Sequence, residues 1–381
     1  MTHKINVLLV AEGDSWGGIE SHIISLTDHY NSNKLINFEC LLFYDSDFYN
    51  ALTARGIKVS KILKNKYCLV KTIFKIRNFL NINSIDIIHT HSLVAAFYMS
   101  LSILFKNNIS IINTLHGKAE KTGGLRSLKE SISRMIVYST IRYKRDAKMI
   151  CVSSDLYEWS RKILKIPLNK LKIINNGISI NDCKINKVKR ENYGVLKNDF
   201  VAAIIGRLTE VKGHIYLFEA VRNLLKDYNK NNKFKLLVIG DGPLYNDLNE
   251  YCIENNITKT IIMMGHIHNA IDMISICDII IIPSLHEGIP YSMLEGMLLE
   301  KPILASNVGG IKEVIINNYN GILVPPKDSN IIKDKIIELM ETPEIRRIIA
   351  ANGKNTVMNR FLSDGMAKET IQAYQQLLTR S

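Results

Sequence analysis

Two glutamates in the second half of the sequence lie on a loop and on the helix expected after it. An aliphatic strand ends at Pro283, and the loop that follows contains Glu287. The helix is expected to begin near Pro290, which suits a first turn, and it carries Glu295. A helix N-terminus attracts phosphate or sugar oxygens. The two carboxylates could then bind hydroxyl groups of one ligand, although a capped helix with solvent-facing glutamates would have the same sequence.

Two basic residues follow another buried strand. This strand ends at Gly206, and Arg207 and Lys212 come next. Arginine offers a planar fork of donors and lysine a compact positive charge, so together they could clamp a diphosphate. Basic residues at strand ends are also common on protein surfaces, so this pattern alone is a weak signal.

A tight turn, Gly240 to Pro243, follows a third strand. Its glycines let the backbone approach a ligand closely. The turn lacks the third glycine of the GxGxxG pattern, so it gives little support to a nicotinamide dinucleotide site.

Two candidates lie in the first half. Gly17 and Gly18 follow the first strand and open a helix, where close approach of phosphate or sugar is possible. An ordinary flexible turn explains these glycines equally well. His116 ends another strand. A lone histidine is more often structural than catalytic, but its place at a strand end makes it a candidate for the site.

Three patterns that resemble metal sites are not expected to bind metal. They are the acidic pair Asp45 and Asp47, the pair His89 and His91, and the pair His266 and His268. Asp45 and Asp47 lie far in sequence from the diphosphate candidates, and the histidine pairs have no third ligand near them in the sequence. The six cysteines form no CxxC pair. The sequence therefore predicts no metal site.

Short apolar runs alternate with amphipathic stretches along the whole chain. The expected strands are 6–11, 38–44, 85–90, 109–115 and 149–153 in the first half, and 200–206, 235–240, 260–264, 279–283, 303–306 and 321–324 in the second. Several are continuous aliphatic runs, typical of parallel strands buried on both faces. Helical patterns lie between them, for example at 17–29, 215–228 and 328–340. The expected fold is α/β, with two Rossmann-like doubly wound domains facing an interdomain cleft, where ligands bind at the carboxyl ends of the strands.

The expected domains follow from a polar segment at 175–199. They are an N-terminal Rossmann-like domain at 1–184, a second Rossmann-like domain at 185–361, and a C-terminal helix at 362–381.

The charge of the chain is uneven. Of the formal net charge of +13, residues 1–185 hold +12 and the remainder +1. An anionic partner would explain this, and so would a solvated basic face. Basic residues cluster at 58–77, among them Lys71, Lys75 and Arg77, and at 118–148. They alternate with apolar residues: Leu69, Val70, Phe74, Met135, Ile136 and Tyr138.

The apolar stretch at 93–105 is too short for a membrane span and is expected to be a buried helix. With no signal peptide and with cysteines that suit a reducing compartment, a cytoplasmic location is expected, with peripheral attachment to the inner face of the membrane left open.

The ordered motifs resemble the family 4 retaining glycosyltransferases of GT-B fold over nearly the whole chain. These motifs are Gly17-Gly18, His116-Gly117, Asn175-Asn176-Gly177-Ile178, Gly206-Arg207-Leu208, Lys212-Gly213, Gly240-Asp241-Gly242-Pro243, Glu287-x7-Glu295, Ser306-Asn307-Val308-Gly309-Gly310 with Glu313, and Asn320-Gly321-Ile322-Leu323-Val324. Asn175-Asn176 departs from the commoner Pro-Asn of that turn.

The resemblance implies a role for each domain and each candidate. The domain at 1–184 would bind the acceptor, the domain at 185–361 would bind the nucleotide-sugar, and the helix at 362–381 would cross back to the N-terminal domain. Arg207 and Lys212 would hold the diphosphate of a nucleotide-sugar and Glu295 the ribose. Glu287 and His116 would lie by the donor sugar. The remaining donor contacts would come from the backbone of Gly288, Ile289, Pro290 and Tyr291 on the sugar hydroxyls, Gly18 by the phosphates, the Gly240 turn, and the backbone around Ile267 at the base.

The resemblance also implies a reaction. It is transfer, with retention, of a hexose or N-acetylhexosamine from a UDP-sugar to a glycan acceptor, with no cofactor and no essential metal. The basic half suits a lipid-linked acceptor at an anionic membrane and gives no motif for nucleic acid. Surface polysaccharide synthesis (lipopolysaccharide, capsule or O-antigen) is the expected pathway. A GT-B-fold sugar-nucleotide epimerase and a non-catalytic partner in an assembly complex remain as alternatives.

Overall fold

The computed structural model of the chain describes residues 4–13, 16–30, 35–63, 68–106, 108–118, 124–186, 188–227, 233–267 and 269–379. The chain divides into two compact units, Met1–Gly177 with Ser363–Ser381, and Ile178–Leu362. The boundary therefore lies before Ile178 and not at the expected 184/185. The physical reason is that Ile178 and Cys183 pack in the core of the second unit, and the Ile178 N–H donates to the Phe361 carbonyl at 2.8 Å.

The first unit is built on seven parallel strands in the order β3-β2-β1-β4-β5-β6-β7. The strands are β1 (Ile5–Ala11), β2 (Ile36–Leu42), β3 (Lys58–Lys61), β4 (Ile87–Thr90), β5 (Ser110–Leu115), β6 (Ala147–Cys151) and β7 (Leu171–Ile173). Its helices are α1 (Gly18–Tyr30), α2 (Asp47–Ala54), α3 (Leu69–Ile82), α4 (Leu93–Ser102), α5 (Gly124–Tyr143), α6 (Ser154–Lys162) and α14 (Ser363–Leu378).

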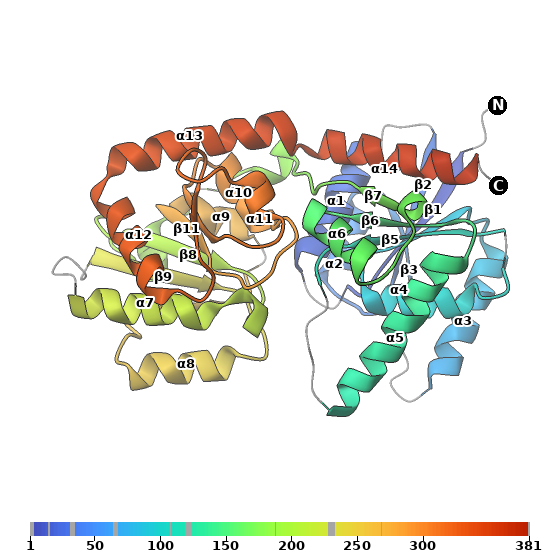
Figure 1. Ribbon diagram of the computed structural model, residues 1–381, viewed down its shortest axis with the longest axis horizontal. Coiled ribbons are helices and arrows are strands. Elements are labelled where there is room, and N and C mark those ends of the chain that lie inside the picture. The colour runs from blue at the N-terminus through green and yellow to red at the C-terminus, as the bar shows by residue number, and fades with distance from the viewer. Residues whose placement is uncertain are drawn as a thin grey trace. The chain divides into compact units, whose positions relative to one another are not determined.

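Both faces of this sheet are buried, as the aliphatic runs predict. Within β1, Val7 and Leu9 pack with α1, α2 and α14, whereas Leu8 and Val10 pack with α3 to α6 on the other face. Figure 1 shows these helices against the sheet. The last helix, α14, packs against α1, and the hydroxyl of its buried Tyr374 lies 2.6 Å from His89 Nδ1.

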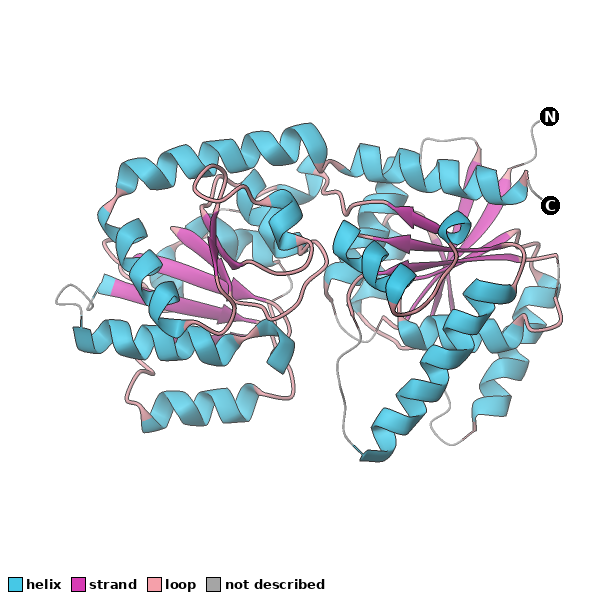
Figure 2. Cartoon of the chain, in the orientation of Figure 1, coloured by secondary structure: helices cyan, strands magenta, loops and turns pink. Residues whose placement is uncertain are grey.

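The second unit has six parallel strands in the order β10-β9-β8-β11-β12-β13. They are β8 (Phe200–Ile205), β9 (Phe234–Ile239), β10 (Ile261–Gly265), β11 (Ile279–Ile282), β12 (Ile303–Ser306) and β13 (Ile322–Val324). Its helices are α7 (His214–Asp227), α8 (Tyr245–Glu254), α9 (Ala270–Ile276), α10 (Tyr291–Leu298), α11 (Ile311–Val314), α12 (Ser329–Glu341) and α13 (Pro343–Arg360). Figure 2 shows the strands of this unit between helices.

The expectation of two doubly wound parallel domains is confirmed. Each expected strand corresponds to a strand of the structure, and the observed start and end both lie within two residues of the predicted ones. The expected helix at 215–228 is α7, although residue 228 lies outside the described residues. Strands β3 and β7 were not predicted, because both are short edge strands whose residues are partly exposed and form no continuous apolar run.

Candidate functional site

The candidate donor residues of the second unit gather where the strand order of the sheet reverses. The chain runs outward from β8 through β9 to β10, and then returns to β11 beside β8 before continuing to β12 and β13. At such a reversal the loops after the two central strands diverge and leave room for a ligand at the carboxyl edge. Arg207 and Lys212 follow β8, and Glu287 follows β11.

Lys212 and Glu287, which are 75 residues apart in sequence, form an ion pair at this edge. The Lys212 Nζ lies 2.6 Å from Glu287 Oε1, and the side chains are 28% and 12% exposed. The hydroxyl of buried Ser284 donates to the same carboxylate oxygen at 2.9 Å. Two donors thus fix the Glu287 carboxylate, and the lysine retains an accessible side from which it could meet an anion.

Close backbone approach holds these loops in place. Gly240 has a φ of +142°, and a Cβ there would lie 2.0 Å from the Gly206 carbonyl oxygen. Gly309 has a φ of +49°, and its Cβ would lie 2.0 Å from the Glu287 carbonyl oxygen. That same oxygen accepts a hydrogen bond from the Gly310 N–H at 3.1 Å. Larger residues would displace the loops that carry the ion pair.

The other predicted donor residues lie on the segments that follow β8, β10 and β11. Arg207 is exposed directly after β8, and Ile267 is half-buried after β10, two strands away. Pro290 caps α10, on which Glu295 is half-buried. The loop residues Gly288, Ile289 and Pro290 and the first helical residue Tyr291 are buried.

A small cavity of about 10 Å³ lies behind the ion pair, room for about one water and not for a nucleotide. Its polar lining includes Lys212, His214, Ser284, Glu287 and Ser292. Burial, reinforced by the Lys212 charge, lowers the pKa of His214 to about 4, so its imidazole is neutral. Sequence analysis did not single out His214 or Ser284, although Ser284 directly follows the predicted strand at 279–283 and His214 directly precedes the predicted helix at 215–228.

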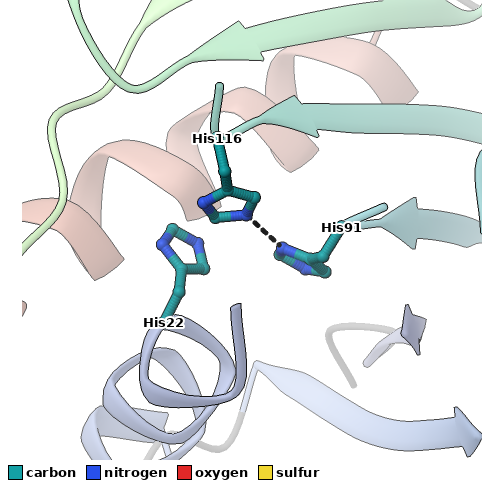
Figure 3. A group of neighbouring side chains, drawn as sticks. All are labelled: His22, His91 and His116. Carbon is teal, nitrogen blue, oxygen red and sulfur yellow. Dashed lines mark hydrogen bonds between the residues drawn. The ribbon is translucent and has the colours of Figure 1, made fainter. Parts of the chain in front are cut away.

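In the first unit, His116 lies at the carboxyl edge of the sheet with two other histidines. His116 follows β5, His91 follows the neighbouring β4, and His22 comes from α1, whose first residue is the predicted Gly18 (Figure 3). His91 Nδ1 lies 3.4 Å from His116 Nε2. His22 Nδ1 lies 3.1 Å from Asn176 Oδ1, and its Nε2 is buried without a hydrogen-bond partner.

This cluster corrects one expectation from the sequence. His91 was judged to have no third metal ligand nearby, but one nitrogen from each of His22, His91 and His116 lies within 4.8 Å of the other two. Its sequence neighbour His89 is not part of the group, because its two nitrogens lie 2.6 Å from the Tyr374 hydroxyl and 2.7 Å from the Thr114 hydroxyl.

Among the described residues, Asp45, Asp47 and His266 do not belong to a group of three possible metal ligands. Asp45 pairs with Lys61 at 3.0 Å, and Asp47 begins α2. Of the pair His266 and His268, the second lies outside the described residues.

Comparisons with known proteins point to one kind of enzyme. Residues 186–356 match the family model "Glycosyl transferases group 1", and residues 16–182 match "Glycosyltransferase Family 4". An uncharacterized glycosyltransferase of Methanocaldococcus jannaschii is 30% identical over 346 residues, which cover 89% of each chain. The UDP-Gal:alpha-D-GlcNAc-diphosphoundecaprenol alpha-1,3-galactosyltransferase of Escherichia coli is 25% identical over 82% of this chain and 79% of its own.

A solved structure has the same fold over the whole chain. Anabaena HepE in complex with UDP-glucose matches with a TM-score of 0.83 at 19% identity, covering 98% of this chain and 100% of its own. At this identity the likeness shows the fold alone. That fold is GT-B, as the sequence motifs predict.

The buried histidines of the first unit predict a loss of stability in acid. Burial lowers the pKa of His22 from 6.5 to about 4, partly opposed by Asn176, and holds the pKa values of His89, His91 and His116 well below 6.5. The unfolded chain therefore binds more protons below pH 6.5, so the free energy of unfolding falls as the pH drops from 6.5 towards 4. Between pH 7 and 5, His22 alone contributes about 2 kcal/mol of this loss.

Urea unfolding followed by tryptophan fluorescence measures this effect selectively, because both tryptophans, Trp16 and Trp159, lie in the first unit. His22→Gln should reduce the difference in unfolding free energy between pH 7 and 5 by about 2 kcal/mol. The control is His266→Gln, at an exposed histidine of the second unit. This variant should show the same difference in unfolding free energy between pH 7 and 5 as the wild type. Equal pH dependence in wild type and His22→Gln would contradict the account.

Proposed function

The chain belongs to the glycosyl transferases group 1 family, and we propose that it moves a hexose or N-acetylhexosamine from a UDP-sugar, with retention, to a lipid-linked glycan acceptor. The observation that carries the proposal is the Lys212–Glu287 pair at the reversal of strand order, held by Ser284 and by close backbone contacts. Surface polysaccharide synthesis is the proposed pathway. It is supported by the E. coli relative, whose name specifies UDP-galactose and a diphosphoundecaprenol-linked acceptor.

The proposed donor site uses the carboxyl edge of the second unit. Exposed Arg207 and the accessible side of Lys212 supply positive charge for the diphosphate, and α10 directs its N-terminus to the same edge. We assign Glu295 to the ribose. The base is assigned to the backbone around Ile267, and the Gly240 turn gives the nucleotide close access to the backbone.

The proposed reaction requires no metal. As the bond to the sugar breaks, negative charge grows on the leaving diphosphate, and fixed positive groups stabilise it without reorganisation. Lys212 can do this while its contact with Glu287 keeps it oriented. Glu287 is assigned to the donor sugar with the N–H groups of Gly288, Ile289 and Tyr291. Pro290 has no N–H and contributes through the turn that it fixes. We also assign His116 to a position beside the donor sugar.

The reaction is tested by incubating the protein with UDP-sugars and lipid extract. We expect release of UDP together with a new glycolipid whose anomeric configuration matches the donor, and full activity in EDTA. A free epimerised sugar nucleotide would indicate an epimerase. Absence of UDP release with any donor, although UDP binds, would indicate a non-catalytic partner.

Replacing Glu295 should mainly reduce UDP affinity, whereas replacing Glu287 should mainly reduce kcat. Glu295→Gln should weaken UDP binding about 10-fold or more, since a charge-assisted hydrogen bond contributes about 1.5–3 kcal/mol. Glu287→Gln should lower kcat by about 100-fold with little loss of UDP affinity, because the substitution leaves the Lys212 charge in place. Glu300→Gln, at an exposed ion pair with Lys354, is the control and should behave as wild type. Parallel losses of UDP affinity and kcat in both variants would contradict this division.

An exposed apolar and basic surface of the first unit supports the proposal of a lipid-linked acceptor. Helix α4 packs against both α3 and α5 on one face of the sheet. Large apolar side chains are exposed on α3, just after α4 and on α5, the most exposed of them being Val70, Phe74, Ile82, Leu104, Phe105, Met135 and Tyr143. Lys71 and Lys75 are exposed among those of α3. Among the described residues, no helix is long and apolar enough to span a membrane. The attachment that we propose is peripheral, through these exposed side chains.

Two residues in the predicted basic and apolar pattern have other roles. Arg77 donates to the carbonyls of Leu101 and Ser102 and so ties α3 to α4. Tyr138 is buried in the core of the unit. Lys71 and Lys75 are therefore the residues to test for lipid binding.

We predict that the protein floats with anionic vesicles, that high salt releases it, and that neutral vesicles do not recover it. Each lysine near an anionic surface contributes about 1 kcal/mol. The double variant in which Glu replaces both Lys71 and Lys75 should therefore bind vesicles at least 10-fold more weakly and bind UDP as the wild type does. The matched control replaces exposed Lys197 and Lys259 of the second unit with Glu, which makes the same change in charge. Equal loss in both double variants would indicate a net-charge effect and contradict the proposed surface.

A further inference from the structure

We propose that His22, His91 and His116 form a binding site for a zinc-class divalent cation in the first unit, and that the bound cation inhibits transfer. The binding claim rests on the histidine cluster alone. The claim of inhibition rests in addition on the proposed function, because it requires the role given to His116.

The spacing of the three rings fits a common ion. Imidazole nitrogens bound to zinc at 2.0–2.1 Å in tetrahedral geometry are about 3.3 Å apart, and the ring centroids about 5 Å apart. His91 Nδ1 and His116 Nε2 are 3.4 Å apart, which is long for a hydrogen bond but suits two ligands of one ion. The three centroid distances are 4.9, 5.1 and 5.7 Å.

His22 supplies the third nitrogen. Its Nδ1 can donate to the Asn176 carbonyl-type oxygen at 3.1 Å, which fixes the tautomer and leaves a lone pair on Nε2. That Nε2 is buried without a partner on a residue only 2% exposed. Figure 3 shows the His22 ring directed towards the other two. A second polar group that orients a ligating histidine is typical of protein zinc sites.

The elements that carry the rings are tied together. His91 and His116 end neighbouring strands, and within those strands Asn113 Nδ2 donates to Thr90 Oγ1 at 3.0 Å. The ring of His89 lies 4.1 Å from that of His91, and both His89 nitrogens have partners. The ligands are thus held by packed strands and a helix, which favours a defined coordination geometry.

The chemistry of the group favours borderline cations over Mg²⁺ or Ca²⁺. Three neutral imidazoles suit Zn²⁺, Cu²⁺, Ni²⁺ or Co²⁺, whereas Mg²⁺ and Ca²⁺ need oxygen ligands. Three protein ligands leave a fourth position for water. Coordination uses Nε2 of His116, so the ion withdraws this residue from the donor sugar. Catalysis without metal and inhibition by metal are then compatible.

Binding is measured by adding Co²⁺ to the chelator-treated full-length protein. We expect one equivalent to produce the visible absorption of four-coordinate cobalt and one equivalent of Zn²⁺ to abolish it. His22→Ala should weaken Zn²⁺ binding by more than about 100-fold, and Asn176→Ala by about 10- to 100-fold, as expected for a residue that orients a ligand. His266→Ala, in the other unit, should bind as wild type. No one-equivalent binding, or undiminished binding by His22→Ala, would overturn the proposal.

Histidine-selective NMR of the wild-type protein tests the same claim without a substitution. Zn²⁺ should shift the imidazoles of His22, His91 and His116 most, and the neighbouring His89 ring less, because it lies 4.1 Å from that of His91. The other six of the ten histidines in the sequence should be unchanged. Shifts confined to other histidines would overturn the site. In a transfer assay, Zn²⁺ should inhibit the wild type but not His22→Ala. If zinc binds as described but transfer is not inhibited, the inhibitory claim fails and the site stands. A protein that binds zinc but transfers no sugar would contradict the proposed function, and with it the claim of inhibition, whereas the zinc site would stand.

Discussion

Every described strand pairing in this protein is parallel, and the position of the candidate sites follows from that constraint. Parallel strands place all their carboxyl ends on one edge of a sheet. Residues distant in sequence, such as Lys212 after β8 and Glu287 after β11, therefore arrive at the same edge. His91 and His116 meet in the same way after β4 and β5. Because helices cover both faces of each sheet, the edges are where polar side chains from several strands can converge.

In the proposed sugar transfer, the partly exposed Lys212–Glu287 ion pair at the edge of the second unit has two roles. The contact with Lys212, aided by Ser284, keeps the Glu287 carboxylate oriented. The same contact holds the lysine in place while its other side remains available to a phosphate. Glu287 also partly neutralises that lysine, so a second cation improves the electrostatics of a bound diphosphate. Arg207, which follows β8 and is exposed, is the residue suited to this role.

Much of the fold could be predicted because its signals are local. Continuous aliphatic runs identified the central strands, and glycines and prolines identified the turns that end them. The edge strands β3 and β7 were missed because they lack such runs. The unit boundary was misplaced because the polar residues around Ile178 suggest a linker, whereas Ile178 itself pairs with Phe361 through a backbone hydrogen bond.

Sequence motifs name single candidate residues, but they do not indicate which of these residues contact one another. The motifs named Lys212 and Glu287, yet nothing in the sequence indicates that they pair. The group of His22, His91 and His116 was missed for a related reason: its members come from three separate segments, and local spacing carries no information about such a meeting. Arg77 and Tyr138 illustrate the limit of pattern alone, since a basic or aromatic residue on an amphipathic helix can face the core as well as the solvent.

The central claim is that the carboxyl edge of the second unit binds the diphosphate of a nucleotide-sugar, and calorimetric titration with UDP tests it most directly. Wild-type protein should bind UDP, and Arg207→Ala should bind it about 10- to 100-fold more weakly, because a charge-assisted contact to phosphate contributes about 1.5–3 kcal/mol. Arg347→Ala, which removes an exposed arginine of the same unit paired with Glu344, should bind UDP as the wild type does. Equal affinity in the wild type and Arg207→Ala, or no UDP binding by the wild type, would contradict the account.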